Sequence, residues 1–98
     1  MKLSPAQRQQ IAEICKRYGV SKLSLFGSAA QGTDGPHSDV DLLVDFIPGK
    51  APGLEIVDMQ AELSRVFQGR RIDLAFPSVL RNPWRRSAIE PQLQTIFQ

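Results

Sequence analysis

The sequence predicts one small domain of the α/β (α+β) class, a mixed sheet of about three strands with helices packed on one face. Three observations lead to this prediction. The chain has 98 residues, enough for a single modest core, so residues 1–98 are taken as one domain. Its apolar content of 42% and charged content of 22% are ordinary for a globular protein. Helical and strand patterns alternate along the chain, in the order helix, strand, short helix, strand, helix, strand, helix.

The first helix is predicted over about residues 5–18. Ser4 can cap this helix, Pro5 suits its first position, and Gln7 completes a capping box. Apolar residues follow at helical spacing: Ile11, Ile14, Cys15 and Tyr18. Gly19 is typical of the residue just past a helix end. The single cysteine therefore belongs to the predicted core, and it can form no internal disulfide.

The clearest strand is predicted over residues 40–46. Successive side chains of a strand point to opposite faces. One face here is apolar and consists of Val40, Leu42, Val44 and Phe46. The other face carries Asp39, Asp41, Leu43 and Asp45. A short strand over residues 22–26 precedes it, and a third over residues 71–76 repeats the pattern with Asp73 on its polar face.

A second amphipathic helix is predicted over residues 54–67, after a connector rich in Pro and Gly. The two long helices are the natural covers for the apolar face of the sheet. Residues 78–98 are interrupted by Pro83 and Pro91. Apolar residues continue there at Ile89, Leu93, Ile96 and Phe97, and they suggest a last short helix against the core.

Composition narrows the classes of function. No apolar run is long enough to cross a bilayer, and the polar N-terminus does not resemble a signal peptide. The lone cysteine fits a reducing cytoplasm. A net charge of +2 is too small to indicate nucleic-acid binding. Residues 70–86 nevertheless contain five arginines and only one acidic residue, Asp73. The arginines are Arg70, Arg71, Arg81, Arg85 and Arg86. They could meet phosphate, an acidic partner surface or solvent alone.

Asp39 and Asp41 are the first candidate site residues. They lie two apart on a strand, so their carboxylates point the same way, about 6–7 Å apart. Like charges this close repel, and a divalent cation removes the repulsion. Magnesium prefers hard oxygen ligands and usually takes one or two carboxylates together with substrate phosphates.

Asp73 can join the pair if the strands 40–46 and 71–76 are neighbours, since strand alternation places it on the same face. Three carboxylates and two magnesium ions favour a polyphosphate ligand, which is the two-metal arrangement for phosphoryl or nucleotidyl transfer. Asp73 is then the candidate to orient or deprotonate the acceptor hydroxyl. A salt bridge from Asp73 to Arg70 or Arg71 is the alternative.

Gly27 and Ser28 form the second candidate element. A strand ends there and a short helix can begin, so backbone N–H groups and the Ser28 hydroxyl are available to phosphate. The spacing from Gly27 to Gly32 matches a P-loop, but Thr33 stands where the lysine of that motif belongs. The glycine and glutamate of a calcium-binding EF-hand are also missing from their required spacing.

Together these motifs resemble the minimal nucleotidyltransferase family of the DNA polymerase β superfamily. The resemblance covers about residues 22–77 and rests on three segments: Gly27-Ser28 with Gly32, Ser38-Asp39-Val40-Asp41 with Leu42-Leu43-Val44, and Ile72-Asp73-Leu74. It implies a nucleotidyltransferase fold, two Mg²⁺ ions held by Asp39, Asp41 and Asp73, and triphosphate contacts at Gly27 and Ser28. It also implies that ATP is the donor and that a HEPN-domain toxin is encoded nearby. This chain would be the antitoxin, and it would transfer AMP to that toxin.

One position departs from the family pattern. Gln31 stands where Gly-Ser-x-Ala-Arg-Gly has an arginine, so a positive charge is missing from the phosphate-binding segment. Three functions follow as hypotheses. The first is adenylyl transfer to a partner protein, and the second is neutralisation of that partner by occlusion without catalysis. The third is transfer to a small molecule, for which 98 residues leave no acceptor domain unless a homodimer or a partner supplies one.

Overall fold

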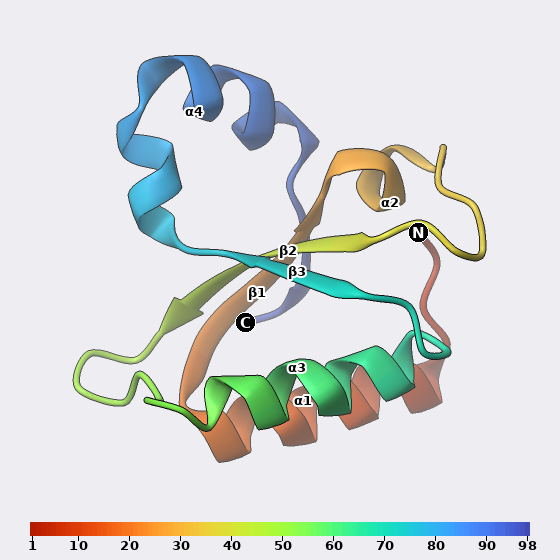
Figure 1. Ribbon diagram of the computed structural model, residues 1–98, viewed down its shortest axis with the longest axis vertical. Coiled ribbons are helices and arrows are strands. Elements are labelled where there is room, and N and C mark those ends of the chain that lie inside the picture. The colour runs from red at the N-terminus through yellow and green to blue at the C-terminus, as the bar shows by residue number, and fades with distance from the viewer.

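The structure is a computed structural model that describes residues 1–98. Its single sheet has four strands in the order β3-β2-β1-β4 (Figure 1). The strands are β1 (Val20–Phe26), β2 (Val40–Phe46), β3 (Ile72–Ala75) and β4 (Gln94–Phe97). β1 runs antiparallel to β2 and to β4, whereas β2 and β3 are parallel, so the sheet is mixed. The predicted fold class is confirmed, with one strand more than expected.

Helices connect the strands. The α-helices are α1 (Pro5–Tyr18), α2 (Gly27–Gln31), α3 (Ile56–Val66) and α4 (Pro83–Ile89). Two short 3-10 helices, η1 (Pro77–Arg81) and η2 (Glu90–Gln92), flank α4. None of these helices combines the length and the hydrophobicity that a membrane-spanning helix requires.

The prediction for α1 is confirmed at both ends. The Ser4 side chain accepts a hydrogen bond from the Gln7 amide, and the Gln7 side chain accepts one from the Ser4 amide. Gly19 ends the helix in the left-handed conformation at φ 75°, which costs glycine little. Local sequence is therefore sufficient to fix this helix.

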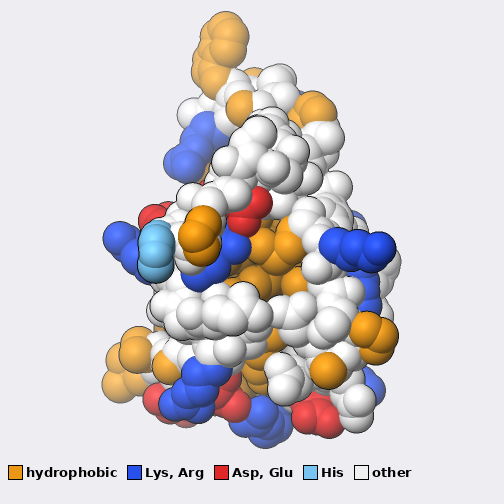
Figure 2. Space-filling view, turned by 90° about the vertical axis from the view of Figure 1, so that its right-hand side faces the viewer, with side chains coloured by type: hydrophobic (Ala, Val, Ile, Leu, Met, Phe, Trp, Pro, Cys, Tyr) orange, Lys and Arg blue, Asp and Glu red, His pale blue; other side chains and the backbone are white.

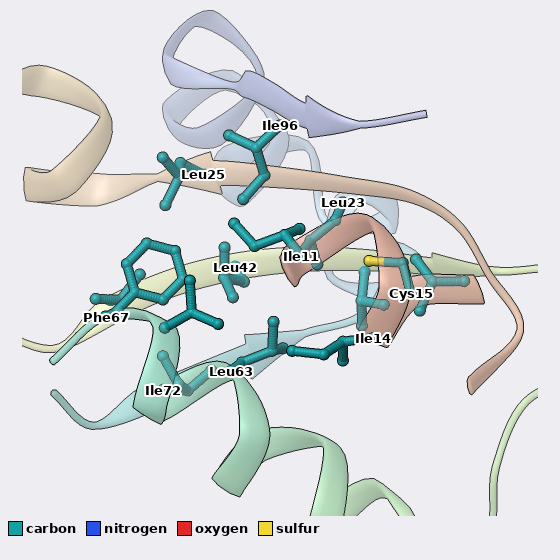
Figure 3. Packing of buried hydrophobic residues seen from close by; sticks show 14 of the residues in the cluster. Ile11, Ile14, Cys15, Leu23, Leu25, Leu42, Leu63, Phe67, Ile72 and Ile96 are labelled. Carbon is teal, nitrogen blue, oxygen red and sulfur yellow. The ribbon is translucent and has the colours of Figure 1, made fainter. Parts of the chain in front are cut away.

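The main core lies between the sheet and the two long helices. α1 and α3 run side by side across one face of the sheet (Figure 1). Seventeen buried residues form one cluster, to which α1 contributes Ile11, Ile14 and Cys15, and α3 with the residue after it contributes Leu63 and Phe67 (Figure 3). Burial raises the pKa of the Cys15 thiol to about 12, so this side chain is an inert core residue, as predicted.

The end of the chain corrects one prediction. Residues 94–97 form the edge strand β4 instead of a last helix, and Ile96 packs into the main core from there (Figure 3). β4 pairs with Ser24 and Leu25 of β1. A four-residue strand has little local preference of its own, and the pairing with β1 decides its conformation.

The chain must cross the whole sheet between β3 and β4, because these strands are its opposite edges. Residues 77–92, here called the crossing segment, do so over the face that α1 and α3 leave open (Figure 1). Leu43 on that face is only 5% exposed, and Ile89 of the crossing segment is 8% exposed. The carboxylate face of β2 is therefore partly covered, which the alternation along β2 did not predict.

Candidate active site

Asp41 and Asp73 are brought together by the parallel pairing of β2 with β3. They are direct partners in the register, and neighbouring strands are about 4.8 Å apart. Both side chains therefore leave the same face of the sheet, as the sequence predicts. Asp39 lies one residue before β2 and is exposed, as Asp73 is, whereas Asp41 is half-buried.

The electrostatics of Asp41 show that the three carboxylates influence one another. Burial raises the pKa of the Asp41 carboxyl above its usual value of 3.8, and the negative charges of Asp73 and Asp39 raise it further. No three His, Cys, Asp or Glu side chains stand close enough together to hold a metal ion as they are placed. The predicted ligands thus influence one another electrostatically, but their side chains are not close enough together to coordinate one metal ion as they are placed.

Gly27 connects this carboxylate face to the start of α2. Its φ of +69° is left-handed, and a β-carbon at this position would collide with the Oδ2 atom of Asp41. The two predicted halves of the site, the glycine turn and the aspartate strand, therefore touch at this point. Because Gly27 has no side chain, the Asp41 carboxylate can occupy the space where a β-carbon would otherwise lie.

Gln92 adds a contact that sequence reasoning missed. Its side-chain oxygen accepts a 3.0 Å hydrogen bond from the Gly27 amide, one of the donors expected to meet phosphate. The Ser28 hydroxyl makes no hydrogen bond within the chain and is free for a ligand. Gln92 ends the crossing segment, 65 residues from Gly27 in sequence, so no local signal could have identified the pair.

Arg70 holds the loop that leads into the site. Its side chain is 8% exposed, forms a 2.8 Å ion pair with Asp34, and donates a 2.8 Å hydrogen bond from Nε to the Ser38 carbonyl. It therefore fixes the residue next to Asp39. The predicted alternative of an Arg70–Asp73 salt bridge is wrong, because Arg70 pairs with Asp34 and Asp73 makes no ion pair.

The predicted arginine cluster is divided by the fold. Arg70 is buried in its contact with Asp34, whereas the other four members are exposed and make no salt bridge: Arg71, Arg81, Arg85 and Arg86. Gln31 is also exposed, at the end of α2. Buried Arg70 thus cannot replace the charge that Gln31 lacks.

The fold and the paired carboxylates identify the class of protein. Residues 8–94 match the family described as the nucleotidyltransferase domain, and the chain belongs to this family. The match spans α1 through the start of β4 and includes every candidate site residue.

Named relatives are similar over most of their length. A Methanocaldococcus jannaschii protein, provisionally named protein adenylyltransferase MJ1379, is 31% identical over 78 residues, 79% of this chain and 77% of that protein. The protein adenylyltransferase MntA of Thermococcus cleftensis is 36% identical over 72 residues, 71% of this chain and 69% of the relative.

Two solved structures share the fold. One is described provisionally as a minimal nucleotidyltransferase, with a TM-score of 0.67, 30% identity, and coverage of 85% of this chain and 83% of that one. The other is a crystal structure of a toxin-antitoxin with AMP-PNP, with a TM-score of 0.64, 20% identity, and coverage of 92% of this chain and 72% of that one. The predicted resemblance to minimal nucleotidyltransferases is therefore confirmed.

Proposed function

We propose that this nucleotidyltransferase is Mg²⁺-dependent and moves AMP from ATP to a hydroxyl of a partner protein, as the antitoxin of a HEPN-domain toxin. The observation that carries the proposal is the pairing of Asp41 with Asp73 beside the Gly27 turn. This arrangement combines a carboxylate face with a backbone segment that can approach phosphate closely.

The donor set fits magnesium. Asp39, Asp41 and Asp73 offer hard carboxylate oxygens. Burial and then the charges of Asp73 and Asp39 raise the pKa of Asp41, and a bound cation would offset both effects. Asp39 and Asp73 are exposed, so their side chains are free to turn toward a shared ion. When bound, Mg²⁺, in one or two ions, supplies charge neutralisation at the triphosphate and a lowered pKa for the attacking oxygen.

The residues of the chain take distinct parts in the transfer. Asp73, exposed on the edge strand β3, orients the acceptor hydroxyl and takes its proton. The acceptor oxygen then forms a bond to the α-phosphorus of ATP as the bond to pyrophosphate breaks. Gly27 leaves room for the Asp41 carboxylate beside the start of α2, and Ser28 donates its hydroxyl to the phosphates.

The relatives support the acceptor and the partner. The Thermococcus MntA is named a protein adenylyltransferase, and a toxin-antitoxin crystallised with an ATP analogue has the same fold. We propose that the HEPN partner, in a hetero-oligomer, brings the acceptor hydroxyl to Asp73.

Gln31 favours a second candidate, an antitoxin that neutralises its partner by binding and occlusion alone. The side chain is neutral and exposed, and no buried or paired cation takes its place. Loss of one phosphate-binding charge weakens catalysis without removing a surface for the partner.

Labelled ATP tests both candidates. The protein is incubated with magnesium, α-labelled ATP and the HEPN protein encoded beside it. Label on the partner must disappear in Asp39→Asn and Asp41→Asn. Asp45→Asn is the matched control, because it lies on the same strand about 13 Å from Asp41. If the two site variants transfer no label and still neutralise the partner, occlusion is the function.

A further inference from the structure

The crossing segment is the most exposed part of the chain beside the candidate active site. All eight residues from 81 to 88 are exposed, and Trp84 in α4 is 86% exposed. A hydrophobic side chain projects from the top of the molecule in Figure 2, at the end that α4 occupies in Figure 1. An indole this exposed contributes nothing to the core and is costly to leave in water.

The charges around Trp84 have a single sign. Arg81, Arg85 and Arg86 are exposed and make no salt bridge, and Glu90 is the only acidic residue after Asp73. The tight start of α4 holds them together, because the Asn82 side chain accepts hydrogen bonds from the Trp84 and Arg85 amides. A tryptophan among arginines is the composition that dominates binding energy at protein interfaces.

The position of the crossing segment links it to the reaction. It spans the face that carries Asp41 and Asp73. The side-chain oxygen of its last residue, Gln92, accepts a hydrogen bond from the Gly27 amide. A protein that contacts residues 81–88 would therefore lie on the same side of the sheet as Asp73 (Figure 1). Of the other exposed apolar side chains, Phe76 directly precedes the crossing segment and is 40% exposed. Ile47, Leu54 and Val57 come after the far end of β2, and Ile47 lies about 20 Å along the chain direction from Asp41.

We infer that the exposed face of residues 81–88 is the docking surface for the acceptor protein, and that it takes an acidic segment of that protein. This inference rests on the proposed function and adds to it the chemistry by which the acceptor is recognised. Trp84 is the apolar anchor of the contact, and the three arginines select the acidic segment and orient it.

A polypeptide fits this surface better than a nucleic acid does. Three free arginines on one short helix and its preceding turn are a smaller set of cations than a phosphate backbone engages, and the whole chain carries only +2. Asp41 and Asp73 lie on the face that the crossing segment spans, and their charges repel a continuous polyanion. Discrete carboxylates that alternate with neutral residues avoid that repulsion.

Trp84 is the only tryptophan in the chain, so its fluorescence reports on this surface alone. The protein is titrated with a random copolymer of glutamate and tyrosine, without ATP or magnesium, at low and at high salt. We expect the emission to shift to the blue as Trp84 leaves water, and the affinity to fall when the salt rises. The same titration with ATP alone or with a single-stranded oligonucleotide should leave Trp84 exposed.

Charge reversal tests the arginines. The triple variant R81E/R85E/R86E should lose affinity for the copolymer by at least about tenfold. R8E/K16E/R65E changes the net charge equally on exposed residues of α1 and α3, away from this face, and should bind like the wild type. Trp84→Ala, followed with a dye-labelled copolymer, should also weaken binding. Circular dichroism confirms that each variant is folded.

Four results would overturn the inference. They are no binding by the wild type, equal loss in both triple variants, tighter binding of the oligonucleotide, or an ATP-induced shift that competes with the copolymer. Asp41→Asn separates this inference from the proposed function, because it should abolish label transfer and leave the Trp84 shift unchanged. If no label is transferred by any form while the shift and its loss behave as expected, catalysis fails and the docking surface stands.

Discussion

Replacing Gly27 with alanine should remove activity far more than it removes stability. Gly27 and Gly32 bracket α2 with nearly the same left-handed φ, +69° and +75°. A β-carbon at Gly27 collides with Asp41 Oδ2, whereas one at Gly32 meets nothing within 4 Å. Gly32→Ala is therefore a matched control that has the same backbone cost without the collision.

The magnitude follows from the two contributions. Left-handed backbone costs an alanine about 1–2 kcal/mol, and the smaller entropy of its unfolded chain returns roughly 0.5 kcal/mol of this. Both variants should thus unfold about 1 kcal/mol more easily, a fall of roughly 4–8 °C in Tm for a domain of this size. The colliding atom at Gly27 is the tip of a short side chain, so it can rotate away at little cost. That rotation removes the Asp41 carboxylate from its place.

Thermal unfolding and label transfer are measured on both variants. We expect similar Tm values, near-normal transfer in Gly32→Ala, and a loss of at least about a hundredfold in Gly27→Ala, as for a misplaced catalytic group. Mn²⁺ binding, followed by electron paramagnetic resonance, should weaken only in Gly27→Ala. Equal transfer by the two variants would refute the inference that Asp41 needs a glycine at position 27 to keep its carboxylate in place.

Three further predictions concern stability. In metal-free protein at neutral pH, Asp41→Asn should raise Tm, because the pKa of Asp41 is raised in the folded state and its charge there is unfavourable. The gain should vanish toward pH 3.8, where the wild-type carboxyl is protonated too, and a gain that persists there would contradict the electrostatic cause. Arg70→Met should cost about 2–3 kcal/mol in urea unfolding, since it leaves Asp34 and the Ser38 carbonyl without their partner; a change under 1 kcal/mol would mean that the loop is held by other contacts. Ile96→Ala should cost about 2–4 kcal/mol in the same measurement, as expected for a buried apolar residue; a cost under 1 kcal/mol would contradict the packing of Ile96 in the main core.

The sequence was sufficient wherever short-range pattern decides the structure. The capping box and glycine stop define α1, and two-residue alternation places Asp41 and Asp73 on one face. Their meeting required only that β2 and β3 be neighbours, which the structure confirms. The candidate metal-binding and nucleotide-binding roles of these residues stay predictions.

Contacts between distant segments could not be read from the sequence. Gln92 reaches Gly27 only because β3 and β4 are opposite edges of the sheet, and nothing local in residues 77–92 states which edge the chain returns to. The spacing of Ile89, Leu93, Ile96 and Phe97 predicts a last helix, whereas residues 94–97 form a strand that depends on hydrogen bonds to β1. The sequence does not identify Asp34 as the partner of Arg70, because the two residues are 36 positions apart.

The burial of Cys15 makes the chain suitable for site-specific labelling without removal of its native cysteine. Its thiol, with a pKa of about 12, carries almost no thiolate at neutral pH and lies inside the core. A maleimide dye or spin label would therefore react with a cysteine introduced on the surface and leave the native one unmodified. One such label on α4 and another on its partner would give the distance between the two proteins during the reaction.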